Sequence, residues 1–190
     1  MEKIRTFVAI EIPSEIQEKI NELQMKLKPL AGGISWVRSQ NIHLTLKFLG
    51  EIEQNLLGSV ISTVTQAAEG VSPFQIRIWG IGFFPNAQRP RVIWVGCEET
   101  SQQLLRLQAT LENSLATIGF EKEKRKFSPH LTIGRVKYFK NIAEVVSAVK
   151  DLDFNAGEFD VQRMVVMRSQ LHPAGSIYTP LGEAQLGSVN

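Results

Sequence analysis

The sequence is poor in the residues that build metal and redox sites. Its 190 residues include one cysteine, Cys97, and only three histidines, His43, His130 and His172. A single cysteine cannot form an intramolecular disulfide or supply a pair of thiolate ligands. The sequence also lacks GxGxxG, P-loop and HExxH motifs, which argues against a nucleotide-cradling loop and a zinc site of the zincin type. We therefore expect no cofactor and no bound metal.

The sequence also has no large excess of positive or negative charge and no long hydrophobic run. Lysine and arginine number 21 and aspartate and glutamate number 19, which leaves a formal net charge of +2 at pH 7. This balance excludes a protein that coats nucleic acid by bulk electrostatics. No apolar run reaches the ~18 residues of a membrane span, and the N-terminal MEKIRTFVAI is too short and too charged for a signal peptide. We expect a cytoplasmic monomer that does not bind membranes.

Hydrophobic residues, 43% of the chain, alternate between helix-like and strand-like spacing. Helical spacing covers the stretches 16–27, 52–67, 104–115 and 142–149. Strand-like spacing covers the stretches 4–12, 34–38, 42–49, 74–84, 91–97, 129–136, 159–171 and 177–181. Because several consecutive strands have no helix between them, a doubly wound parallel sheet is disfavoured. We expect one α+β domain over residues 1–190, with antiparallel sheets and helices on their outer faces.

Two of the three histidines lie in nearly the same local sequence. His43 begins HLTL within NIHLTLKFLG, and His130 begins HLTI within SPHLTIGRV. Threonine occupies only 9 of the 190 positions, so chance does not explain two histidines with a threonine two residues later. Side chains two residues apart in a strand lie on the same face. Each copy therefore presents one imidazole and one hydroxyl, from Thr45 or Thr132, on a strand whose other face packs in the core.

The same alternation makes predictions for the residues that follow each motif. It places Lys47 on the polar face with the first pair, and it places Phe48 in the core. Arg135 falls on the face opposite the second pair unless a bulge at Gly134 reverses the alternation, and a glycine within a strand often marks such a bulge. Arg135 is then a candidate for a phosphate contact, with a surface or interlobe salt bridge as the alternative.

Two imidazoles and two hydroxyls on one surface suit acid–base chemistry at phosphorus. The imidazole pKa of about 6.5 lies near the working pH, so one neutral ring can accept a proton while one protonated ring donates a proton to a leaving oxygen. Threonine hydroxyls can donate hydrogen bonds to the non-bridging oxygens, where charge accumulates. Such a set can cleave a phosphoester in line without a metal.

These motifs make the chain resemble the 2H phosphoesterase superfamily and, within it, the RNA 2′,3′-cyclic phosphodiesterases, also called the 2′-5′ RNA ligase family. The resemblance extends over most of the chain. It rests on NIHLTLKFLGE near residue 45, RPRVIWVG at 89–96, FSPHLTIGR at 127–135 and IYTPL at 177–181. It implies two pseudo-symmetric lobes around a central cleft, each lobe contributing one HxTx strand.

The resemblance also implies an activity and a role for each site residue. The family hydrolyses the 2′,3′-cyclic phosphate of RNA ends or nucleotides to a 2′-phosphomonoester. By resemblance, His43 is the proton donor to the departing 3′ oxygen and His130 is the proton acceptor that activates water. Thr45, Thr132 and Arg135 bind the substrate's phosphate. The residues alone do not distinguish the acid from the base.

Other functions are compatible with the same residues. Ligation of 2′-5′ RNA linkages or hydrolysis of a small cyclic nucleotide would use the same pair of histidines, and a non-catalytic module could bind RNA ends. The basic segment 122–126 either steers RNA or forms a solvated loop balanced by Glu121 and Glu123. Aromatic residues in strand-like runs are expected in the core, and none is selected as a base-stacking surface. His172 lacks a threonine partner and is expected at the surface.

Overall fold

A computed structural model describes residues 2–138, 140–173 and 175–187. Within these residues nine strands form one antiparallel sheet in the order β7-β4-β5-β6-β3-β1-β8-β9, and β2 pairs with β6 beside this path. The strands are β1 (Lys3–Glu11), β2 (Ile34–Trp36), β3 (His43–Glu53), β4 (Phe74–Phe84), β5 (Val92–Glu98), β6 (His130–Val136), β7 (Asn155–Val161), β8 (Arg163–Gln170) and β9 (Ile177–Gln185). The helices are α1 (Ser14–Leu27), α2 (Leu57–Glu69), α3 (Gln103–Thr117) and α4 (Ile142–Lys150). The predicted α+β class with antiparallel pairing is confirmed.

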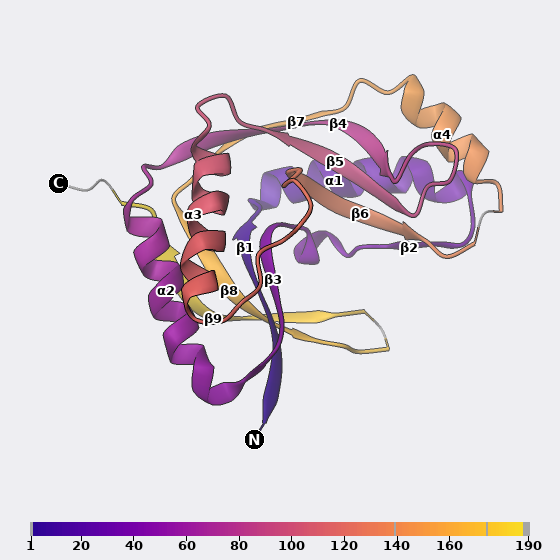
Figure 1. The fold of residues 1–190 in the computed structure, drawn as a ribbon. Helices are drawn as coiled ribbons and strands as arrows, with labels where there is room; N and C mark the ends of the chain where they lie inside the picture. The colour runs from indigo at the N-terminus through magenta and orange to yellow at the C-terminus, as the bar shows by residue number, and fades with distance from the viewer. Residues whose placement is uncertain (1, 139, 174, 188–190) are drawn as a thin grey trace.

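The sheet has two halves that meet in its middle. One half contains β1, β3, β8 and β9, and the other contains β2, β4, β5, β6 and β7. A bridge from Leu44 on β3 to Leu131 on β6 joins them. Helices α2 and α3 pack beside each other over the first half, whereas α1 packs against β7 in the second half. Figure 1 shows α2 and α3 at one end of the molecule and α4 at the other.

A large hydrophobic core lies between the sheet and the helices and extends through both halves. The helices bury the residues that recur at helical spacing, such as Ile16, Ile20 and Leu23 of α1. A second, smaller cluster is formed by Phe7, Ala9, Val165 and Met167, with Tyr178 packed against it. The sheet is therefore apolar on both sides where β1 and β8 lie.

The run 159–171, which we expected to be one strand, is two strands. β7 pairs with β4 in the second half of the sheet, and β8 pairs with β1 in the first half. The chain therefore crosses between the halves at Gln162, whose carbonyl accepts a hydrogen bond of 2.7 Å from the Leu186 amide. The hydrophobic pattern does not reveal this crossing, because the end of β7 and the start of β8 both bury apolar side chains and read as one continuous run.

Candidate active site

The two HxTx motifs begin adjacent antiparallel strands, β3 and β6. Leu44 lies opposite Leu131, so the register sets each histidine level with the threonine of the other motif. Both leucines are fully buried, while the four polar side chains are half-buried. We call the side of the sheet that carries these four side chains the motif face. The structure thus brings together all four predicted polar residues, which are His43, Thr45, His130 and Thr132.

Both imidazoles are held by the same type of hydrogen bond. The Nδ1 atom of His43 lies 2.7 Å from the carbonyl oxygen of Asn41, and the Nδ1 atom of His130 lies 2.7 Å from the carbonyl oxygen of Ser128. A carbonyl only accepts hydrogen bonds, so each Nδ1 carries the proton. In the neutral form each Nε2 is then unprotonated and can accept or, after protonation, donate a proton.

His43 is packed between two aromatic rings of the smaller hydrophobic cluster. Phe7 stacks on it with ring centroids 4.7 Å apart, and Tyr178 meets it edge-on at 5.1 Å. This burial lowers the pKa of His43 below its ordinary value of 6.5. The hydrogen bond to the Asn41 carbonyl opposes that shift, and the charge of Arg135 lowers the pKa further. In the free protein at neutral pH, the uncharged form of His43 therefore predominates.

Two aromatic residues from the other half of the sheet pack around His130 in the same way. Phe84 meets the His130 ring edge-on at a centroid distance of 4.9 Å, and Trp94 lies at 6.5 Å. Phe84 and Trp94 also pack against each other at 5.2 Å. Each histidine therefore has two aromatic neighbours and one backbone carbonyl to orient its ring.

A β-bulge occurs at the same position in both motifs. On β3 the register skips Leu46 between consecutive partners on β1, and on β6 it skips Ile133 between consecutive partners on β5. Each skipped residue is the fourth of its HxTx motif. An extra residue in one strand reverses the facing of the side chains that follow it. The residue five positions after each histidine therefore returns to the motif face.

The bulges place one cation and one aromatic ring on the motif face. Arg135 is exposed there, and its charge acts on His43; the bulge that reverses the alternation leaves Ile133 unpaired, one residue before the predicted Gly134. Our prediction that Phe48 packs in the core is wrong, because Phe48 is 60% exposed and its ring centroid lies 6.1 Å from that of Phe7. The regular alternation on which that prediction rested ends at the bulge.

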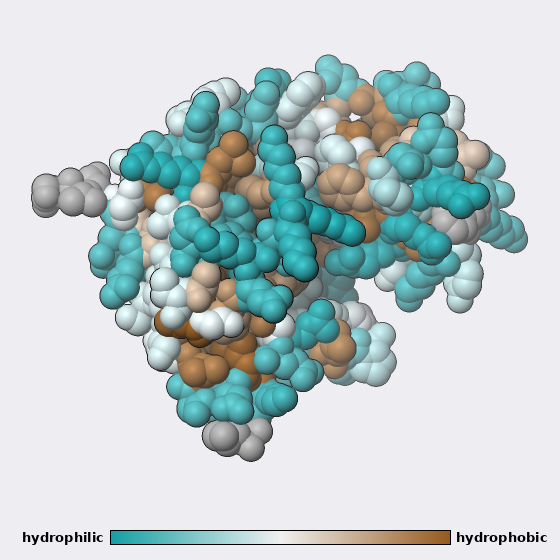
Figure 2. All heavy atoms as spheres, in the orientation of Figure 1, coloured by the Kyte–Doolittle hydropathy of each residue, from teal (hydrophilic) through white to brown (hydrophobic). Residues whose placement is uncertain are grey.

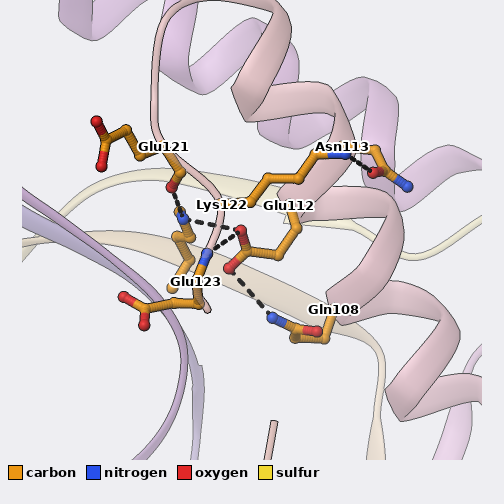
Figure 3. A network of polar contacts seen from close by, with 7 residues as sticks. Gln108, Glu112, Asn113, Glu121, Lys122 and Glu123 are labelled. Carbon is orange, nitrogen blue, oxygen red and sulfur yellow. Dashed lines mark hydrogen bonds and ion pairs between the residues drawn. The ribbon is translucent and has the colours of Figure 1, made fainter. Parts of the chain in front are cut away.

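Lys47 lies on the opposite side from the predicted one. It is 3% exposed, and its Nζ donates to Glu112 Oε2 at 2.8 Å and to the Glu121 carbonyl at 2.5 Å. The Glu112 carboxylate also accepts from the Glu123 amide and from Gln108, each at 3.2 Å (Figure 3). This network fastens the segment before β6 to α3 and β3 and leaves Lys47 unable to reach a substrate on the motif face.

Several residues around the site had no signal in the sequence. Phe7 and Phe84 lie in ordinary apolar strands, and the hydrogen bonds to the histidines come from backbone carbonyls that any residue could supply. Tyr178 lies in the IYTPL segment, and the resemblance of this segment to the family was the one hint that it lies near the site. The Asn41 side chain additionally donates to the Ser176 carbonyl at 2.6 Å, which ties the turn before β9 to His43. His172 is exposed, as expected.

The described part of the chain offers no group of three or more His, Cys, Asp or Glu residues that could hold a metal ion. None of the helices found in residues 2–138, 140–173 and 175–187 has the length and apolar character needed to cross a membrane.

Comparison with known proteins covers nearly the whole chain. The family described as LigT like Phosphoesterase matches twice, at residues 10–94 and 95–178, and each match contains one HxTx motif. A Thermotoga maritima protein named RNA 2′,3′-cyclic phosphodiesterase is 37% identical over 96% of this chain and 95% of its own length. A Methanocaldococcus jannaschii protein of the same name is 36% identical over 95% of this chain and 99% of its own length.

Solved structures agree with this match. The E. coli LigT complexed with 3′-AMP superposes with a TM-score of 0.80 at 27% identity, covering 98% of this chain and 100% of that one. A Thermus thermophilus protein superposes with a TM-score of 0.83 at 28% identity over the same shares of the two chains. With two matched halves, two HxTx strands and this fold, the chain belongs to the LigT-like phosphoesterase family.

Proposed function

We propose that this protein hydrolyses the 2′,3′-cyclic phosphate of RNA ends and nucleotides to a 2′-phosphomonoester. The names of its curated relatives support this activity. The observation that carries the proposal is the pairing of two histidine–threonine sets on one face of adjacent strands. Both imidazoles have Nδ1 occupied by a carbonyl, which leaves two Nε2 atoms for proton transfer.

The proposed reaction uses one imidazole as a base and the other as an acid. His130 Nε2 accepts a proton from water as the water oxygen attacks phosphorus. The bond between phosphorus and the 3′ oxygen then breaks, and protonated His43 donates its Nε2 proton to that oxygen. The products are a free 3′ hydroxyl and a 2′-phosphate; before the next cycle His130 returns its proton to solvent and His43 takes one up. The in-line geometry requires the two imidazoles to lie on opposite sides of the phosphorus atom.

The acid role of His43 requires that substrate binding favours its protonated form. Burial and Arg135 lower its pKa in the free protein. A bound cyclic phosphate brings a negative charge that compensates for the charge of Arg135 and stabilises the imidazolium. Because Phe7 and Tyr178 shield this part of the site from solvent, His43 and not a water molecule donates the proton to the leaving 3′ oxygen.

The remaining residues of the motif face bind the substrate. The hydroxyls of Thr45 and Thr132 donate hydrogen bonds to the non-bridging oxygens, and Arg135 forms a charge-assisted contact with the phosphate. Phe48 offers an exposed ring against which the terminal base can stack. Because two titrating imidazoles supply both proton transfers, we propose that the reaction needs no metal ion.

The proposal is tested with a nucleoside 2′,3′-cyclic phosphate in the presence of EDTA. We expect full activity and a product that carries phosphate only on the 2′ oxygen, identified by chromatography against both isomers. Formation of the 3′-phosphate would refute the roles assigned to the histidines. Loss of activity in EDTA that returns with a divalent metal would refute metal-independent catalysis.

A further inference from the structure

A groove of about 580 Å³ opens beside His130, on the side of β5 and β4. One wall is the segment 126–129, which leads directly into β6 and includes Ser128, whose carbonyl orients His130. The opposite wall carries Trp79, and the first turn of α3 closes one end with Leu104 and Leu105. Figure 2 shows hydrophobic surface at the upper end of α3 next to the hydrophilic side chains of the segment that leads from α3 to β6.

Trp79 lies on the motif face, level with His130 and two strands away. Trp79 pairs with Gly96 on β5, and Gly96 pairs with His130 on β6. Neighbouring strands are separated by about 4.8 Å, so the two side chains leave the sheet about 10 Å apart. Gly96 carries no side chain between them, and a Cβ there would lie 2.7 Å from the Trp79 carbonyl oxygen and 3.6 Å from the Trp94 ring.

Trp79 is presented to solvent with a cation beside it. It is 42% exposed and lies on the face opposite the buried residues of the same strand. The Arg77 guanidinium lies 5.4 Å from the indole centroid. A guanidinium on one side of an indole leaves the other ring face for a flat ligand, and a nucleobase is such a ligand.

The formal charges around the groove cancel, so a nucleotide there would be held by stacking rather than by net charge. Arg77 and Lys126 contribute positive charge. Glu98 and Glu99 contribute negative charge, and the Glu99 carboxylate accepts hydrogen bonds from the amides of Ser101 at 2.5 Å and Leu104 at 3.1 Å at the start of α3. Glu98 lies opposite Arg77 in the register.

We infer that this groove binds the nucleotide on the 5′ side of the cyclic phosphate end of single-stranded RNA, with its base stacked on Trp79. The inference rests on the proposed function, which places the cyclic phosphate between His43 and His130. Strands β5 and β6 lie between Trp79 on β4 and Phe48 on β3, so bases stacked on these two rings are splayed apart, as proteins commonly bind single-stranded RNA. The terminal base has its own aromatic surface in Phe48.

The inference implies a preference for RNA over a mononucleotide, without a preference for base identity. Stacking is tolerant of sequence because every base has a π face. Three substrates separate the contributions: a nucleoside 2′,3′-cyclic phosphate, a dinucleotide that ends in the same group, and that dinucleotide with an abasic 5′ residue. We expect wild-type kcat/KM to be about tenfold higher for the intact dinucleotide than for the other two.

Two variants of Trp79 complete the test. In Trp79→Ala we expect the tenfold advantage of the intact dinucleotide to disappear, and in Trp79→Phe we expect most of it to remain. Circular dichroism and thermal melts show whether both variants fold like the wild type. Tryptophan fluorescence gives a second readout: the product dinucleotide 2′-phosphate quenches wild-type emission more than that of Trp79→Phe.

Each other outcome overturns a defined claim. Equal wild-type kcat/KM for all three substrates would overturn the groove's role and leave the hydrolysis proposal intact. An equal loss for all three substrates in Trp79→Ala would also overturn it, since Trp79 would then act on the terminal nucleotide or on the fold. Failure of the wild type to hydrolyse any of the three would overturn the proposed function and, with it, this inference.

Discussion

The two HxTx copies share a backbone and differ in the residues that follow. In both, the fourth residue of the motif is an unpaired bulge, Leu46 on β3 and Ile133 on β6. The next position turns to the core, where it is Lys47 in one copy and Gly134 in the other. The position after that returns to the motif face as Phe48 or Arg135.

This difference indicates how a duplicated element divides its tasks. The histidine and threonine are the same in both copies, as the two proton transfers that we propose would require. Outside the motif, one copy supplies an aromatic surface and the other supplies a cation. On the core side, Lys47 needs the carboxylate of Glu112, whereas Gly134 packs directly beneath Ile34 and Trp36.

Removing either imidazole should have the largest effect and should be nearly the same in both copies. We expect His43→Ala and His130→Ala each to lower kcat/KM for a cyclic nucleotide by about 10³-fold, because each removes one proton transfer. The matched control is His172→Ala, which we expect to keep the wild-type rate. Near-wild-type activity in either of the first two variants would show that the copies do not act as a pair.

Breaking the buried ion pair between Lys47 and Glu112 should lower the stability of the protein. The second copy has Gly134 at the position of Lys47 and so has no equivalent pair. We expect Glu112→Gln to lower the free energy of unfolding by about 3 kcal/mol in urea denaturation, because Lys47 is left charged and unpaired inside the protein. The double variant Lys47→Met with Glu112→Leu should recover much of this loss. A Glu112→Gln protein as stable as the wild type would mean that the pair does not anchor the segment before β6.

The pattern of HxTx residues was readable from the sequence, but the bulges were not. Alternation correctly placed the histidines and threonines on one face and the leucines on the other. Nothing in HLTL or HLTI marks the fourth residue as unpaired, and only Gly134 gave a hint, in one copy. The burial of Lys47 depends on Glu112, which is distant in the sequence and comes from α3, so local pattern could not predict it.

Arg135 should matter to every substrate, in contrast to the aromatic side chain at the equivalent position. We expect Arg135→Gln to lower kcat/KM by about 10- to 100-fold for mononucleotide and oligonucleotide substrates alike, the range for loss of a charge-assisted hydrogen bond to phosphate. Phe48→Leu should instead lower activity in proportion to the stacking strength of the terminal base. Equal effects of both variants on every base would remove the distinction between the two positions.

The smallest effect is expected on the titration of His43. A positive charge disfavours the imidazolium, so its removal in Arg135→Gln should raise the pKa of His43 towards 6.5. The pKa should stay below that value, because burial against Phe7 and Tyr178 is the larger cause. NMR titration of the imidazole resonances measures both proteins. An unchanged or lower pKa in the variant would show that Arg135 does not act on His43.

A crystal structure with the product, a nucleoside 2′-phosphate, tests the shared site most directly. We expect the Nε2 atoms of His43 and His130 to approach the phosphate from opposite sides, with the hydroxyls of Thr45 and Thr132 on its non-bridging oxygens. Both Nδ1 atoms should keep their carbonyl partners. A phosphate bound by one histidine only, or away from the motif face, would contradict catalysis by the pair.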